Sequence, residues 1–410
     1  MRPLVNISYS KKFDAIGDTE PTDVEGTLRE FLPEVAFGTE EDFVEAAKTV
    51  AHNWTPPGEL HSTIKDGGIT YEIWRGTLAD PAVKQMIIRT QILSLLFIEG
   101  GSAIVDETNA HGSPTDERWT VFFMFRRDKS AEDPEKPAYT FVGYSTIYRF
   151  FYMDKAAAAQ APPEPQTDSE LPSGDFDLAQ LPCRSRLSQF LILPPFQQAG
   201  NGARLYDTIY QHYYHHAPTK VFVIEDPNEA FDDLRDVCDL SFLQTIPEFA
   251  ALRLKKEYKV PRKGSAHKED FLDLGAIKKL RAKTKIAERQ FMRCVEMHLM
   301  STLPASVRPA MHDAPPAPRP TAEDRHVYEL WRMWVKMRLY VHNRDALGQL
   351  EHGERVEKLD ETLDNVEFEY VRILNMCERR QKAVKGGNGK RKAEEAEGEV
   401  VSKKARVEDE

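Results

Sequence analysis

The sequence predicts an α+β fold in which a mixed central sheet is flanked by helices and followed by a helical carboxyl-terminal region. Residues 1–153 consist mainly of strand-like runs rich in aromatic and β-branched side chains, with one long helical pattern among them. Residues 184–246 have the order strand, glycine turn, helix, strand and helix, which is typical of neighbouring strands in a sheet covered by helices. Beyond residue 247 apolar side chains recur mainly at helical spacing.

Four runs in the amino-terminal part have the composition or the alternation of strands. They are PLVNISYS (3–10), ITYEIWRG (69–76), TVFFMFRR (120–127) and AYTFVGYSTIYRFFYM (138–153). Between the second and third runs, DPAVKQMIIRTQILSLLFIEGG predicts a single helix. Asp80 is expected to be its N-cap and Pro81 its first residue, and Gly100 and Gly101 are expected to end it.

We expect four segments along the chain. They are a strand-rich segment at 1–78, a central domain at 79–246, a helical region at 247–383 and a charged tail at 384–410. Within the central domain, residues 154–182 are rich in alanine, proline and acidic side chains, which predicts a mobile insertion. The tail alternates blocks of charge without apolar periodicity, which predicts disorder.

Composition limits the kinds of partner. The chain has 66 acidic and 55 basic residues and a net charge of -11, which disfavours nonspecific nucleic-acid binding and suits a cationic partner. No run approaches the ~18 apolar residues that span a bilayer, and MRPLVNISYSKKF lacks a signal-peptide core, so neither a membrane nor a secreted protein is expected. Its four cysteines are scattered without metal-ligand spacing, so neither a disulfide framework nor a zinc site is expected.

One stretch combines the features of an anion site. FLILPPFQQAGNGARLYDTIYQ (190–211) is an apolar strand-like run, a proline pair, a glycine turn and a helical pattern, and Gln197, Gly200 and Gly202 form a Q-x-x-G-x-G motif. A helix start carries unpaired N–H groups and about half a positive charge. The loop lacks the Lys-Ser/Thr of a Walker loop, and no ribose-binding acid follows at Rossmann spacing. A backbone cradle for a pyrophosphate remains, and a simple tight turn is the alternative.

A second constellation, Glu225-Asp226-Pro227-Asn228, ends the apolar strand KVFVI. A carboxylate at the carboxyl end of a strand in such a sheet lies next to the ligand crevice and is well placed as a general base. Alternatively, Asp226 simply caps the next helix, with Pro227 at its first position. Both roles are compatible with the sequence.

Two further features are weaker. Glu99 ends an otherwise apolar helix pattern, where a carboxylate opposes the helix dipole, so it is either solvated or assists a cationic substrate. In the aromatic run that ends at Tyr152, Tyr148 and Phe150 share one face of a strand and could line a groove for the alkyl stem of a lysine, whereas a place in the core is the alternative.

Several motifs together resemble one family. FLILPPFQQAGNGA, VIEDPNEAFDDLRD, LLFIEGG, DERW and VGYSTIYRFFYMDK are similar to segments of the catalytic subunits of type B histone acetyltransferases, over about residues 3–302. These enzymes belong to the GNAT superfamily, so the resemblance implies the GNAT acyl-CoA N-acyltransferase fold, with 79–246 as the acetyl-CoA-binding catalytic domain. It also implies transfer of an acetyl group from acetyl-CoA to a lysine side chain, without a metal.

The resemblance assigns roles to individual residues. Backbone groups of Phe190, Leu191 and Ile192 would pair with the pantetheine arm of acetyl-CoA like an added strand. The segment Gln197, Gln198, Ala199, Gly200, Asn201, Gly202 and Ala203 would wrap the pyrophosphate, and Asn228 would also contact the cofactor. Glu225 matches the general base, assisted by Glu99 and Asp226, and Tyr148, Arg149 and Phe150 match a strand that contacts the histone.

The resemblance also implies partners. The substrate would be a lysine in the amino-terminal tail of newly made histone H-4, and a WD-repeat β-propeller histone-binding subunit would be a second partner. Family members usually begin with an additional strand-rich segment, so we expect 1–78 to be a shortened version. The basic clusters KRK (390–392) and KKAR (403–406) resemble import signals and predict a protein shared between nucleus and cytoplasm.

Two other functions are compatible with these motifs. One is a GNAT enzyme that acetylates a small amine or a protein amino terminus, although the long aromatic strand and the large helical region disfavour it. The other is a noncatalytic histone-binding module that retains the fold.

Overall fold

The computed structural model describes residues 4–7, 22–48, 54–105, 113, 115–127, 139–152, 180–259, 267–311 and 316–405. The chain divides into two compact units, Met1–Asn228 and Glu229–Glu410. This division falls before the expected boundary at 246/247. Residues 154–179 of the expected insertion lie outside the described residues.

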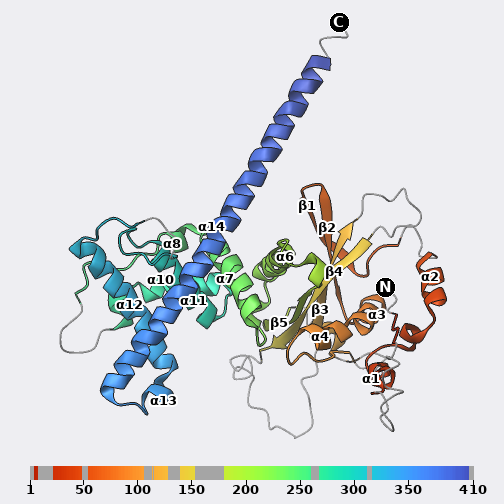
Figure 1. Ribbon diagram of the computed structural model, residues 1–410, viewed down its shortest axis with the longest axis horizontal. Coiled ribbons are helices and arrows are strands. Elements are labelled where there is room, and N and C mark those ends of the chain that lie inside the picture. Colours follow the sequence, from red (N-terminus) through yellow and green to blue (C-terminus); the bar gives the residue numbers. More distant parts are fainter. Residues whose placement is uncertain are drawn as a thin grey trace, which may run out of the picture. The chain divides into compact units, whose positions relative to one another are not determined.

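The first unit is built on a six-stranded sheet whose strands follow one another in chain order (Figure 1). The strands are β1 (Glu59–Asp66), β2 (Ile69–Thr77), β3 (Trp119–Arg127), β4 (Tyr139–Phe151), β5 (Cys183–Ile192) and β6 (Thr219–Ile224). Neighbours are antiparallel except for β5 and β6, which are parallel and joined by helix α6 (Asn201–His215). The sheet is therefore mixed, and the strands predicted at 69–76 and 120–127 are confirmed, as is the one predicted at 138–153 over its described residues.

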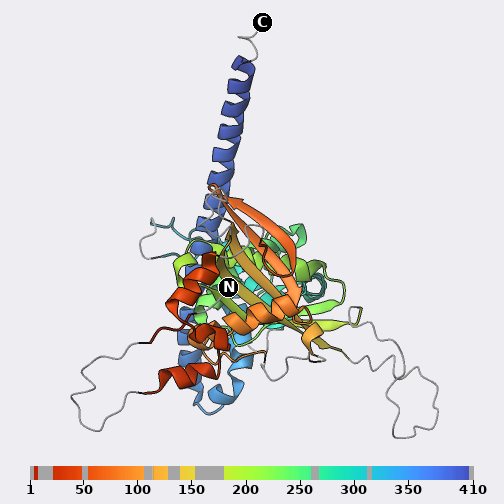
Figure 2. The same cartoon turned by 90° about the vertical axis from the view of Figure 1, so that its right-hand side faces the viewer.

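Helices cover both faces of this sheet, with α3 (Pro81–Thr90) and α6 on opposite sides (Figures 1 and 2). The alternation of β3 explains the two layers, because successive side chains of a strand point to opposite faces. Phe123 is buried in one apolar cluster with Val83 and Ile87 of α3. Its neighbour Phe122 contacts Tyr213 of α6 on the other face, with ring centroids 6.4 Å apart.

The long helix predicted between the second and third strands is two helices. Its start is as predicted, since the Asp80 carboxylate accepts a hydrogen bond of 2.8 Å from the Ala82 N–H and Pro81 is the first residue. However, α3 ends at Thr90 and a second helix, α4 (Ile92–Phe97), follows Gln91. The Gln91 side chain is buried and forms hydrogen bonds with the backbone of Ile104 and Val105. The helix is therefore interrupted at the residue that holds the loop after α4.

The amino-terminal prediction was wrong in part. Residues 4–7 of the expected strand 3–10 form no strand, and residues 8–10 lie outside the described residues. Residues 22–48 instead contain α1 (Val24–Arg29), the 3-10 helix η2 (Glu34–Phe37) and α2 (Glu40–Lys48). Charged side chains at helical spacing, such as Glu25 and Arg29 at i and i+4, favour helix there.

The second unit is helical. Its helices are α7 (Glu229–Leu243), α8 (Pro247–Ala250), α9 (Lys268–Phe271), α10 (Leu274–Thr284), α11 (Glu288–Ser301), α12 (Ala322–His342), α13 (Arg344–Leu347) and α14 (His352–Ala405). Trp331 of α12 is buried and donates a hydrogen bond of 3.0 Å to the backbone carbonyl of Glu296 in α11. Within the described part of the chain, no helix is both long and apolar enough to cross a membrane. Helix α14 continues through residues 384–405, where the sequence predicted a disordered tail, and residues 406–410 lie outside the described residues.

Candidate functional site

The glycine loop of the sequence motif joins β5 to α6. A short 3-10 helix, η5 (Pro194–Phe196), turns the chain after β5, and Gly200 is the N-cap of α6. Gln198 has a φ of 59° and Gly200 a φ of 78°, so the loop uses the left-handed region twice. No side chain caps this end of α6, so the N–H groups of its first turn have no side-chain partner there. These donors are the groups that bind anions at helix starts.

Polar side chains fix the shape of this loop. Gln197 donates a hydrogen bond of 2.8 Å to the backbone carbonyl of Ile192, and Asn201 donates one of 2.9 Å to that of Phe196. Arg204 donates to the Ala199 carbonyl at 2.7 Å and to Asn201 Oδ1 at 2.8 Å. Arg204 also forms an ion pair with Asp66. Arg204 directly follows the motif but has no place in the Q-x-x-G-x-G pattern, so the pattern did not predict its role.

Strands β5 and β6 separate near the base of this loop. The ladder between β5 and β6 ends where Leu187 pairs with Ile224, whereas β5 continues to Ile192 beside β4. Ser188 lies at an irregularity in the β4–β5 register. Its hydroxyl oxygen is buried and has no hydrogen-bond partner within the described residues. The predicted segment Phe190, Leu191 and Ile192 is the stretch of β5 beyond the end of that ladder.

These features fit acetyl-CoA. The first-turn N–H groups of α6 and the Arg204 guanidinium would hold the pyrophosphate, since charge-assisted hydrogen bonds to phosphate are strong. The stretch of β5 beyond Leu187 would face the pantetheine arm, and the Ser188 hydroxyl is a buried polar group that a ligand could satisfy.

Glu225 stands directly after β6, at the point where the two strands separate. Its N–H donates to the Leu187 carbonyl at 2.9 Å, so its backbone is anchored to β5. Its carboxylate is half-buried and forms an ion pair of 2.9 Å with Nη1 of Arg186 on β5. The Arg186 guanidinium in turn lies 4.6 Å from the ring centroid of Phe150 on β4. The structure thus links the predicted base to the predicted substrate strand through an arginine that the sequence analysis did not single out.

The three residues predicted to contact the histone do not share a face. Tyr148 and Phe150 contact each other with ring centroids 4.8 Å apart, and Tyr148 also packs on Trp119, on the α3 side of the sheet. Arg149 points to the α6 side and lines a pocket of about 450 Å³ with His212 and other polar residues. Period-two alternation along β4 causes this separation.

The remaining predicted residues lie at exposed positions around the site. Glu99 is in the turn after α4, and that turn is held to β5 because Gln189 donates to Ser94 Oγ at 3.2 Å and to the Ser102 carbonyl at 2.7 Å. Asp226 is exposed and has a φ of 33°, a left-handed conformation that is uncommon for aspartate. Asn228 is exposed and ends the first unit.

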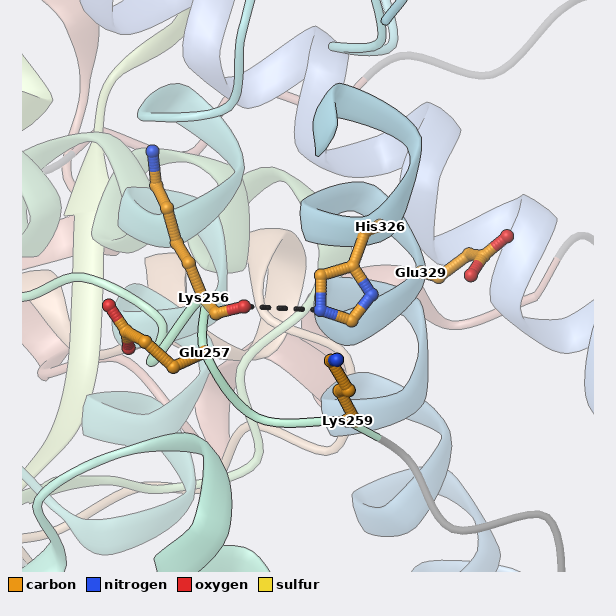
Figure 3. A pocket seen from close by; sticks show the side chains of 5 residues that line it. All are labelled: Lys256, Glu257, Lys259, His326 and Glu329. Atoms are coloured by element: carbon orange, nitrogen blue, oxygen red, sulfur yellow. Dashed lines mark hydrogen bonds between the residues drawn. The ribbon is translucent and has the colours of Figure 1, made fainter. Parts of the chain in front are cut away.

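A pocket of about 420 Å³ in the helical unit has a different character (Figure 3). It is lined by Lys256, Glu257, Lys259, His326 and Glu329. His326 Nε2 is 2.9 Å from the Tyr258 carbonyl and 3.2 Å from the Lys256 carbonyl, which ties the loop before it to α12. This mixture of charges on an exposed surface contains no glycine loop and no strand end, so we do not place the acyl-transfer site there.

Comparisons with known proteins agree with this geometry. The family model "Histone acetyl transferase HAT1 N-terminus" matches residues 1–99, and "Fungal HAT1, C-terminal" matches residues 251–304. The histone acetyltransferase type B catalytic subunit of Gibberella zeae is 50% identical over 424 residues, covering 100% of this chain and 86% of that protein. The chain belongs to the family of type B histone acetyltransferase catalytic subunits. Membership confirms the predicted family and an acetyltransferase activity, and the mixed sheet and helices described above confirm the α+β class.

Other relatives in this family extend over the same length. The type B catalytic subunit of Neurospora crassa is 43% identical over 100% of this chain and 87% of its own, and that of Pyricularia oryzae is 46% identical over 100% and 86%. A solved aminoglycoside acetyltransferase from a soil metagenomic sample aligns with 48% of this chain and 96% of its own, at a TM-score of 0.24 and 15% identity. That TM-score is too low to add to the assignment, which depends on the sequence relatives.

Proposed function

We propose that this chain transfers an acetyl group from acetyl-CoA to a lysine side chain in the amino-terminal tail of newly synthesised, free histone H-4. Glu225 is the general base, and Glu99 and Asp226 assist it. One observation carries the proposal: the Glu225 carboxylate stands one residue beyond the point where β5 and β6 separate, beside the strand segment that fits the pantetheine arm.

The chemistry requires a base at this position. A lysine ammonium has a pKa of about 10.4 and is not nucleophilic at neutral pH, so its proton must leave before attack. Glu225 accepts that proton, directly or through water. Acetyl-CoA supplies the acetyl thioester: the lysine nitrogen forms a bond to the carbonyl carbon, the carbon–sulfur bond breaks, and the sulfur leaves with the electron pair and is protonated by solvent.

The surroundings of Glu225 suit a basic peptide. The chain has a net charge of -11, and Glu99, Asp226 and Glu225 place acidic groups on the segments that border the site. The paired rings of Tyr148 and Phe150 offer an apolar surface next to Arg186. A lysine can lay its alkyl stem along such rings while its charged end reaches the carboxylate.

The partner and the cellular location that we propose are those that the family resemblance and the basic clusters imply. We propose that a WD-repeat β-propeller histone-binding subunit delivers the histone, and that the protein is shared between nucleus and cytoplasm. The support for the location is the pair of basic clusters at 390–392 and 403–406, which have the composition of import signals.

Incubation of the purified chain with acetyl-CoA and a histone H-4 tail peptide, followed by mass spectrometry, tests the proposal. Glu225→Gln should lower kcat by about 10²–10⁴ because the proton acceptor is lost. Coenzyme A affinity by calorimetry should be unchanged in this variant. Glu59→Gln, which alters a glutamate on β1 whose side chain is 83% exposed, is the control and should keep its activity. A noncatalytic module would show no difference among the three proteins.

A further inference from the structure

The Glu225 carboxylate, which we propose as the base, forms an ion pair with Arg186. Arg186 Nη1 is 2.9 Å from Glu225 Oε1, and their side chains are 30% and 35% exposed. An ion pair exposed to this degree contributes little to stability, because water screens it. Because this ion pair includes the proposed base, we expect it to affect catalysis more than stability.

The structure holds Arg186 in place from three sides. Its backbone is paired with Tyr148 of β4 on one side and with Val223 of β6 on the other. Its guanidinium lies over the Phe150 ring at 4.6 Å, within the range of a cation–π contact. The Nε atom of Arg186 is buried and makes no hydrogen bond to any described residue. The guanidinium is therefore pre-organised on β5 before substrate binds.

Arg184 provides a built-in comparison. It lies on the same face of β5 and its guanidinium is 5.4 Å from the same Phe150 ring. It forms no ion pair with an acidic side chain among the residues that the structure describes. The two arginines thus share strand, face and aromatic neighbour and differ in their relation to Glu225.

We propose that Arg186 is a positioning residue that fixes the Glu225 carboxylate at the end of β6, so that it is ready to accept a proton. This inference rests on the proposed function, since it requires Glu225 to be the base. The lysine of the substrate then meets a carboxylate in a defined rotamer, and competes with Arg186 for one of its oxygens.

Other charged groups near Glu225 act less directly. Asp226, also a carboxylate, follows it in the chain and is exposed. Arg184 and Arg118 add positive charge on the face of Tyr148, and Arg118 Nη1 is 3.3 Å from the Tyr148 hydroxyl. Among these, Arg186 is the group with a charge-assisted hydrogen bond to Glu225.

The test compares kcat and the KM for the histone peptide in the wild type, Arg186→Gln and Arg184→Gln. Arg186→Gln should lower kcat about tenfold through looser positioning of the Glu225 carboxylate. Its KM should not rise, because the substrate lysine no longer competes with Arg186 for a carboxylate oxygen. Arg184→Gln should keep both kcat and KM. Thermal unfolding and coenzyme A calorimetry check that each variant is folded.

Arg186→Lys keeps the charge and gives a second measure. We expect a kcat between those of the wild type and Arg186→Gln, because the charge remains but the planar fork is lost. If Arg186→Gln does not fold, this variant decides alone, and a wild-type kcat in folded Arg186→Lys overturns the proposal. A wild-type kcat in folded Arg186→Gln also overturns it. Wild-type turnover in Glu225→Gln would instead refute the base assignment, so the two failures are distinct.

Discussion

At the scale of single residues, His212 shows how burial and charge act together. It lies on α6 with its ring 5.1 Å from that of His61, and Arg75 Nη1 is 3.4 Å from both of its ring nitrogens. Burial, with the added charges of Arg75, His61 and His216, lowers the pKa of His212 to about 3. The folded state therefore keeps this histidine neutral.

This shift predicts a loss of stability in mild acid. Below about pH 6.5 the unfolded chain protonates His212 and the folded chain does not, so the free energy of unfolding falls as the pH drops from 6.5 toward 3. Between pH 7.5 and 5.5, the wild type should lose about 1 kcal/mol more than His212→Gln, after allowance for partial exposure. Urea unfolding at the two pH values measures the difference.

The exposed His215 of the same helix supplies the control. His215→Gln should lose the same stability between pH 7.5 and 5.5 as the wild type. Equal losses in all three proteins would show that His212 is protonated in the folded state at pH 5.5, and would contradict the prediction.

Residue types at strand ends could be predicted from the sequence, but side-chain pairs across the sheet could not. Glu225 was found because it ends an apolar run, and the structure places it at the end of β6. Its partner Arg186 lies in a different strand, and their contact depends on the β5–β6 register, which no local pattern specifies. Alternation along β4 did contain the signal that Arg149 faces away from Tyr148 and Phe150.

At the scale of elements, the break between α3 and α4 serves the site. Gln91 donates a hydrogen bond of 2.9 Å to the Val105 carbonyl and accepts bonds of 3.2 Å from the N–H groups of Ile104 and Val105. These bonds fix the loop that follows Glu99. An apolar 3.6-residue pattern runs through this region, so the sequence predicted one helix. A single buried glutamine that bonds the backbone of another segment does not interrupt such a pattern.

Gln91→Leu should therefore damage both stability and activity. The substitution leaves the N–H and C=O groups of Val105 without their partner in a buried position, at a cost of about 2–4 kcal/mol in the free energy of unfolding. Activity with the histone peptide should fall because the turn that carries Glu99 loses its anchor. Gln85→Leu, on the exposed side of α3, is the matched control. Urea unfolding and kcat/KM give the two readouts, and equal values for both variants would contradict the argument.

At the scale of the whole molecule, the chain divides into two compact units, and the residues that fit acetyl-CoA all lie in the first. Most strands of the sheet and its glycine loop were predictable because strand periodicity and turn residues are local signals. The division at Asn228/Glu229 was not, because α7 has the spacing of a helix that covers a sheet but packs against α11 and α14. The choice of packing partner is a tertiary property that helical periodicity does not encode.

A buried charge network holds the helical unit together. Arg338 of α12 donates to both carboxylate oxygens of Glu296 in α11, at 2.7 and 2.8 Å, and the Tyr370 hydroxyl of α14 donates to the same carboxylate at 2.7 Å. Glu296 is 0% exposed, and burial raises its pKa although Arg338 opposes the shift. Three helices thus contact one buried carboxylate, whose hydrogen bonds are lost if Arg338 or Tyr370 is replaced.

Arg338→Met should destabilise this unit by about 3–5 kcal/mol, because it leaves a buried carboxylate without its counter-ion. The groups that fit coenzyme A all belong to the first unit, so its affinity by calorimetry at 10 °C should be unchanged. Arg308→Met, at an exposed guanidinium that bonds a backbone carbonyl in the same unit, is the control and should change unfolding by less than about 1 kcal/mol. Loss of coenzyme A binding by folded Arg338→Met would show that the first unit depends on this network, contrary to this expectation.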